Sequence, residues 1–95
     1  MDQRIEDTLA ELRNTLAAKN TDYGNAVMKN PVLCPQVSPR LAILTRISDK
    51  VERLVNLANS KTAQVQESFE DTLFDLAGYI VLYFAAMKDA GQNEH

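Results

Sequence analysis

The sequence predicts an all-α protein of three main helices, arranged as an antiparallel bundle that oligomerisation completes. Apolar side chains recur at spacings of three and four residues along most of the chain, which is the period of an α-helix. Only three Gly and three Pro interrupt the 95 residues, as is typical of helical proteins. We expect a single domain over residues 1–95, whose modest core favours assembly with other copies.

The first helix is expected over residues 3–20. One apolar stripe follows it at spacings of four, three and four: Ile5, Leu9, Leu12 and Leu16. A long loop is expected over residues 21–38, where Gly24 and two prolines break the helical pattern. Loops of this length are often functional.

The second helix is expected over residues 39–58. Ser38 suits the N-cap position and Pro39 suits the first turn, where its missing N–H costs nothing. Seven side chains form its apolar face: Ile43, Leu44, Ile47, Val51, Leu54, Val55 and Ala58.

The third helix is expected over residues 67–89, with Gly91 as its stop. From Leu76 onward it is apolar all round, and such helices are covered on more than one side. We therefore expect a homo-oligomer assembled through this helix. Tyr79 and Tyr83 are expected in the core or in that interface, as is Phe84. Its main apolar face comprises Phe69, Leu73, Leu76, Ile80, Phe84 and Met87.

A basic stripe on the second helix predicts contact with phosphate. Four charged residues lie at i, i+3, i+4 and i+7, and so share one face: Arg46, Asp49, Lys50 and Arg53. The guanidinium fork matches phosphate oxygens, and Lys adds a point charge. The alternative is intrahelical pairing, in which Asp49 neutralises the arginines of its own helix.

The segment that closes the first helix supplies further candidates for a ligand site. Tyr23 could stack on a base, while Asp22 or Lys19 could contact ribose or phosphate. The alternative is an ordinary helix end followed by a turn at Asp22-Tyr23-Gly24.

An acidic ladder on the third helix predicts a divalent metal. Glu67, Asp71 and Asp75 repeat every four residues, so their carboxylates can converge on one ion. Mg²⁺ prefers oxygen ligands and is usually held by one or two carboxylates together with substrate phosphates. The alternative is a solvated helix face, since acids are favoured near a helix N-terminus.

Charge and cysteine content narrow the class of protein. A net charge of −3 argues against a general nucleic-acid binder. Cys34 is the only cysteine, which indicates no disulfide framework and a reducing compartment. We expect a cytoplasmic protein with no signal peptide and no membrane association, because the longest uncharged run, Leu76 to Met87, is too short to span a bilayer.

Three segments in order, Lys19 to Gly24, Arg46 to Arg53 and Glu67 to Tyr79, resemble the first nucleotide-modification-associated domain family. The resemblance implies a small helical protein of a kind common in bacteriophages, with a role in nucleotide metabolism. A more distant likeness is to the all-α nucleoside triphosphate pyrophosphatases of the MazG type, which bind Mg²⁺ through acidic motifs on two helices. That likeness implies that Asp49 and Glu52 belong to one motif, and that the other consists of Glu67, Glu70 and Asp71.

Three hypotheses follow. In the first, the protein binds a nucleotide or nucleotide-derived signal by its phosphates and sequesters it, in counter-defence or in managing a nucleotide pool. In the second, it is a Mg²⁺-dependent MazG-like nucleoside triphosphate pyrophosphatase. In the third, it is a structural helical oligomer whose charged ladders are surface ion pairs.

Overall fold

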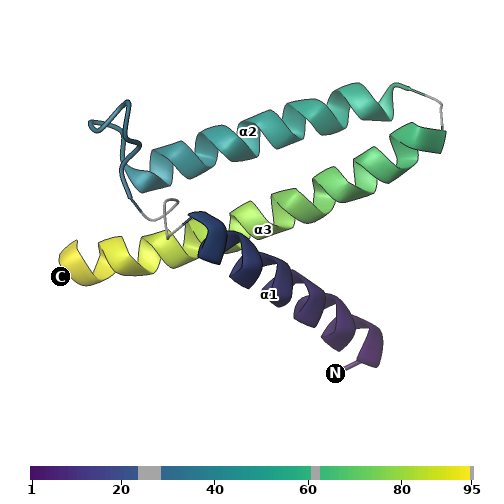
Figure 1. The fold of residues 1–95 in the computed structure, drawn as a ribbon, viewed down its shortest axis with the longest axis horizontal. Helices are drawn as coiled ribbons and strands as arrows, with labels where there is room; N and C mark the ends of the chain where they lie inside the picture. The colour runs from purple at the N-terminus through teal and green to yellow at the C-terminus, as the bar shows by residue number, and fades with distance from the viewer. Residues whose placement is uncertain (24–28, 61–62, 95) are drawn as a thin grey trace.

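Three helices make up the computed structural model (Figure 1): α1 (Gln3–Tyr23), α2 (Pro39–Ala58) and α3 (Ala63–Glu94). The structure describes residues 1–23, 29–60 and 63–94, and only the backbone within residues 20–23, 63–67 and 89–94. No strand occurs in these described ranges. The predicted all-α class is therefore confirmed.

The starts of the first two helices follow from their capping residues. The Ser38 hydroxyl accepts a hydrogen bond from the backbone N–H of Leu41 at 3.2 Å, and Pro39 occupies the first turn of α2. The Asp2 carboxylate accepts a hydrogen bond from the backbone N–H of Arg4 at 2.7 Å, so Asp2 caps α1. Helix α2 covers the range expected from its sequence.

The other helices are longer than expected. Helix α1 continues to Tyr23, so Asp22 and Tyr23 are helical, and the expected turn at Gly24 lies outside the described residues. Helix α3 begins at Ala63 and continues through Gly91 to Glu94. The expectation that Gly91 ends α3 was wrong, because one glycine costs a helix only about 1 kcal/mol.

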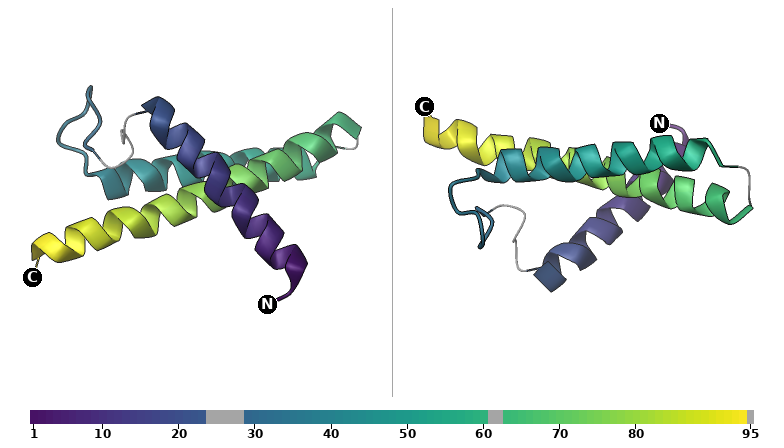
Figure 2. Two further views of the ribbon diagram at one scale, coloured as in Figure 1. Left: turned by 60° about the horizontal axis from the view of Figure 1, so that its bottom comes forward. Right: turned by 90° about the horizontal axis from the view of Figure 1, so that it is seen from above.

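Helices α2 and α3 run antiparallel, side by side, as a helical hairpin (Figures 1 and 2). Ile43 of α2 is 1% exposed and Ala86 of α3 is also buried. They are the two buried hydrophobic residues among those described. The single chain thus has a very small core.

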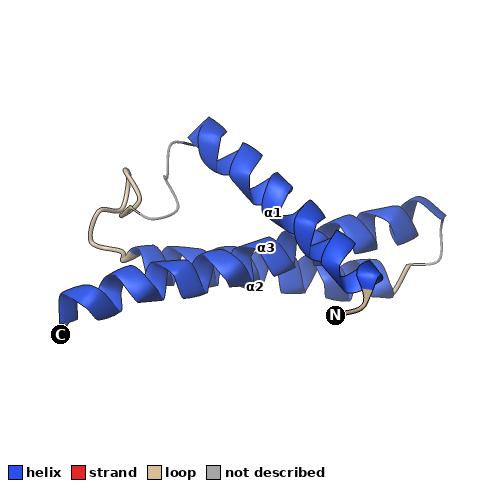
Figure 3. Cartoon of the chain, turned by 90° about the horizontal axis from the view of Figure 1, so that it is seen from below, coloured by secondary structure: helices blue, strands red, loops and turns tan. Residues whose placement is uncertain are grey.

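Helix α1 does not lie antiparallel beside its neighbours; it crosses α3 on one side of the hairpin (Figures 2 and 3). The buried residue Gly78 marks the crossing, since a Cβ there would lie 3.3 Å from Leu16 Cδ2 and 3.9 Å from Leu12 Cδ1. The missing side chain therefore lets α1 approach α3 closely. The expected antiparallel bundle is correct for α2 and α3 only.

The face of α3 that sequence predicts as core is largely bare within the single chain. Phe84 is 61% exposed, and Leu73, Ile80 and Met87 are exposed as well. A different stripe of α3, which includes Thr72 and Asp75, contacts α2 and α1 instead. The strongest apolar face of α3 thus points away from the other helices of its own chain.

In the part of the chain that the structure describes, no helix combines the length and apolar character that a membrane span requires.

Candidate functional site

The basic stripe of α2 lies against α3 in a regular antiparallel register. Arg46 is opposite Tyr79, Lys50 is opposite Asp75, and Arg53 is opposite Thr72. From Arg46 to Lys50 to Arg53 the residue number on α2 rises by four and then by three. The number of the facing residue on α3 falls by four and then by three. The cations therefore contact the neighbouring helix and do not simply point into solvent.

Helix α1 brings a fourth cation to this place. Lys19 Nζ lies 3.1 Å from Asp75 Oδ1, and Lys50 Nζ lies 3.5 Å from Asp75 Oδ2. One carboxylate of α3 thus joins ammonium groups from both other helices. All three side chains keep some contact with solvent, so each pair contributes at most about 1 kcal/mol to stability.

The guanidinium of Arg53 is oriented by a buried hydroxyl. Arg53 Nε donates a hydrogen bond to Thr72 Oγ1 at 3.2 Å, and this hydroxyl donates to the backbone carbonyl of Ser68 at 2.7 Å. Thr72 is 3% exposed, which makes it a fixed acceptor. The two terminal nitrogens of Arg53 are not used in this contact and can donate to a ligand.

The guanidinium of Arg46 rests on an aromatic ring. Its Cζ lies 6.0 Å from the centroid of the Tyr79 ring, at the outer limit of a cation–π contact. No ion pair joins Arg46 or Arg53 to a carboxylate within the described part of the chain. Asp49 forms none with them either, so the structure differs from the intrahelical pairing that the spacing allowed.

Four cations lie on this side of the hairpin, and Asp49 shares the face of α2 with three of them without forming an ion pair within the described part of the chain. Lys19, Arg46, Lys50 and Arg53 gather along one side of the hairpin, and Asp75 pairs with the two lysines alone. Two arginines held by neutral groups keep their forked donors available, which is the arrangement that binds phosphate oxygens.

The acidic ladder behaves differently from the basic one. Asp75 is engaged by two ammonium groups, Asp71 is exposed, and the Glu67 side chain lies outside the described residues. Among described residues, no group of three or more His, Cys, Asp or Glu could hold a metal ion. The Mg²⁺ site at Glu67, Asp71 and Asp75 therefore stays a prediction.

Of the three ligand-binding candidates at the end of α1, the structure places the side chain of one. Lys19 joins the basic surface through Asp75. The side chains of Asp22 and Tyr23 lie outside the described residues, so their contact with a base or ribose stays a prediction.

Sequence reasoning missed two residues of the contact between α2 and α3. Arg40 Nε donates a hydrogen bond to the Tyr83 hydroxyl at 2.9 Å, and its guanidinium lies 5.9 Å from that ring. Its position gave no usable signal, because six residues before Arg46 is about a third of a turn away round α2. Its pairing with Tyr83 is also out of the register that Arg46, Lys50 and Arg53 follow. Thr72 gave no signal either, because nothing local marks a threonine as the acceptor of an arginine from another helix.

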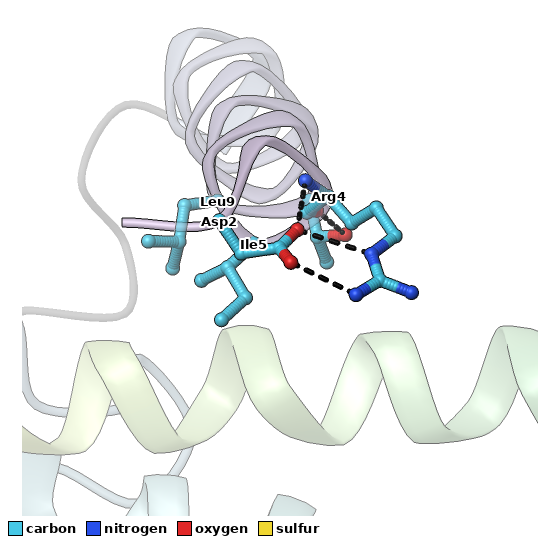
Figure 4. Close-up of a pocket in the computed structure, with 5 residues that line it drawn as sticks. Asp2, Arg4, Ile5 and Leu9 are labelled. Carbon is cyan, nitrogen blue, oxygen red and sulfur yellow. Dashed lines mark hydrogen bonds and ion pairs between the residues drawn. The ribbon is translucent and has the colours of Figure 1, made fainter.

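A separate pocket of about 460 Å³ lies at the N-terminal end of α1 (Figure 4). Ile5 and Leu9 point toward the α3 ribbon, and Asp2 and Arg4 form an ion pair of 2.8 Å at its rim. Hydrogen bonds from the Arg4 side chain and then from its backbone N–H hold the pKa of Asp2 below its ordinary value of 3.8. The pocket contains none of the predicted ligand-binding residues.

Comparison with known protein families gives a match over most of the chain. A family model described as nucleotide modification associated domain 1 matches residues 19–87, the segment that contains the four cations. No curated protein matches the chain, and no solved structure does.

Proposed function

The chain belongs to the nucleotide modification associated domain 1 family, and we propose that it binds a nucleotide or nucleotide-derived signal by its phosphates. One observation carries this proposal. Arg46 and Arg53 are oriented by the neutral groups of Tyr79 and Thr72, and no carboxylate of the described chain neutralises them. Phosphate oxygens are the partners that such paired forks suit best.

The proposed role is sequestration. The binding surface offers charge and orientation. A Cys–His nucleophile is not expected, because the single His of the chain is residue 95 at the end of the sequence. A phage protein of this kind would withdraw a host defence signal or manage a nucleotide pool. We further propose that it acts in the cytoplasm as a homo-oligomer, which would place several basic surfaces on one particle.

A thermal-shift panel tests the proposal. The panel contains mono-, di- and triphosphates and cyclic nucleotides, each with and without Mg²⁺, and the ligand is recovered afterwards. A ligand at 100 times its Kd adds about 2.7 kcal/mol, a shift on the order of 10 °C for a domain of this size. Stabilisation without Mg²⁺ and with intact ligand is expected.

Paired variants locate the site. Arg46→Ala/Arg53→Ala removes two charge-assisted contacts of about 1.5 to 3 kcal/mol each, so the affinity should fall at least about a hundredfold. Arg13→Ala/Lys88→Ala removes two exposed cations elsewhere and should leave it unchanged. Retained binding in the first pair would contradict the proposal.

The pyrophosphatase stays a second hypothesis, with Mg²⁺ as its cofactor. Stabilisation only with Mg²⁺, together with cleaved ligand, would favour it, and Asp71→Asn should then abolish turnover without unfolding the protein. Lys19 and Lys50 compete with a metal for Asp75, which favours the binding role. No shift across the whole panel would favour the structural oligomer.

A further inference from the structure

Two opposite sides of the α2–α3 hairpin differ in chemistry. At about 100° per residue, Gly78, which contacts α1, lies to one side of the α3 stripe that faces α2. Leu73, Ile80 and Phe84 lie to the other side, and all three are exposed. Figure 3 shows α1 on one side of the hairpin only.

Helix α2 continues the bare apolar stripe. Leu41, Val51 and Val55 are exposed and lie about 160°, 80° and 120° round the helix from the buried Ile43, all in the same sense. We measure the angle of each side chain round its helix from the stripe that faces the other helix, in the direction of increasing residue number. Because α2 and α3 are antiparallel, side chains at the same angle on the two helices lie on the same side of the hairpin. The six exposed side chains therefore form one surface, the apolar face: Leu41, Val51, Val55, Leu73, Ile80 and Phe84.

The surface area of the chain shows how much remains to be covered. Its accessible surface is 7342 Å², whereas a compact monomer of this mass exposes about 5,500 Å². The surplus of about 1,800 Å² is summed over the whole chain, and it leaves room for the roughly 800 Å² per partner that a standard interface buries. The radius of gyration of 15.3 Å likewise exceeds the roughly 12 Å of a compact chain of this length.

We propose that the apolar face is covered by the same face of a second copy, so that two α2–α3 hairpins pack into a four-helix bundle. A hairpin with one apolar side lacks half of such a bundle, and a two-fold axis supplies the other half from an identical surface. None of its six residues is charged, so contact between these residues and the same residues of a copy buries no ion. The basic surface lies on the opposite side, toward α1, so the proposal is independent of nucleotide binding.

The mass of the full chain in solution tests the proposal. Sedimentation equilibrium should give at least twice 10.6 kDa for the wild type. Phe84→Glu should shift the mass toward the monomer, because Phe84 is 61% exposed within the chain and would be buried only in the assembly. Asn56→Glu, an exposed polar position off the apolar face, is the matched control and should keep the wild-type mass.

Two further measurements keep the test decisive. Circular dichroism should show that Phe84→Glu retains its helices, and Leu41→Glu provides an independent variant on α2. A monomeric wild type would overturn the proposal and assign the face to a different occupant. An unchanged mass in both folded Glu variants would also overturn it, since assembly would then use another surface.

Discussion

The two sides of the α2–α3 hairpin show how one helix pair can be specified for two environments. On the side of α1, polar side chains are individually matched: Arg53 with Thr72, and Lys50 with Asp75. On the opposite side, apolar side chains such as Ile80 and Phe84 stay exposed, and the ring contact that Phe84 makes is with Tyr83, the residue before it on the same helix. The first side is complete enough to orient groups for a ligand, while the second needs burial that a single chain does not provide.

The largest expected effect contrasts a buried with a bare isoleucine. Ile43→Ala should cost about 2 to 5 kcal/mol at any protein concentration, because Ile43 is 1% exposed within the chain. Ile80 is 43% exposed, so Ile80→Ala should cost little in dilute solution and progressively more as association covers it. Urea unfolding at protein concentrations about a hundredfold apart measures both. If the stability lost in Ile80→Ala did not depend on protein concentration, the contrast between the buried and the exposed isoleucine would be contradicted.

The crossing of α1 over α3 should tolerate only a small side chain at position 78. Gly78→Phe should displace α1 and cost about 1 to 3 kcal/mol through overpacking against Leu16. In Gly78→Ala the end of the Leu16 side chain has to shift by a few tenths of an ångström, and the gain of about 1 kcal/mol in helix propensity offsets this. Thermal unfolding compares the two variants. An equal loss of stability in both variants would mean that the backbone of α1, and not the Leu16 side chain, limits the space at position 78.

Removing the charge of Asp75 should have different effects on phosphate binding and on metal-dependent hydrolysis. Asp75→Asn releases Lys19 and Lys50, at a cost to stability of about 1 kcal/mol or less for these part-exposed pairs. Affinity for a phosphate ligand should then rise or hold. A metal-dependent hydrolase would instead lose turnover. Calorimetric titration together with an assay for released phosphate or pyrophosphate separates the two outcomes.

The smallest effect concerns the cap of α1. Because its native pKa is lowered, Asp2 stabilises the fold above its unfolded pKa, and this contribution is lost as the pH falls through the native pKa, below 3.8. The stability difference between wild type and Asp2→Asn should therefore be present at neutral pH and vanish in acid. Chemical denaturation at several pH values measures it. A difference that persists at the lowest pH would show that the cap acts without its charge.

The helices were predictable because their causes are local. The Ser38-Pro39 start of α2 fixed one boundary, and the periodic apolar residues fixed the existence of all three helices. The basic stripe was predictable for the same reason, since Arg46, Lys50 and Arg53 share one face. Gly91 did not end α3 as expected, because a glycine costs a helix only about 1 kcal/mol. That cost is too small for one residue to set a helix end.

The partners of those faces were not predictable from one sequence. The apolar stripe that includes Leu73 and Phe84 predicts burial, but both residues are exposed within the chain. Periodicity does not say whether a covering helix comes from the same chain. The crossing at Gly78 depends on Leu16, 62 positions earlier, and the orientation of Arg53 depends on Thr72 of another helix. Such contacts are set by tertiary geometry, which local patterns do not encode.

The most direct test of the two-sided account is NMR mapping of amide and methyl shifts on the labelled protein. Addition of the best nucleotide from the panel should shift Arg46, Lys50, Arg53 and Tyr79 most strongly, whereas dilution should shift Leu41, Val55, Ile80 and Phe84. Nucleotide shifts centred on the apolar face, with the cations of α2 unaffected, would contradict the account.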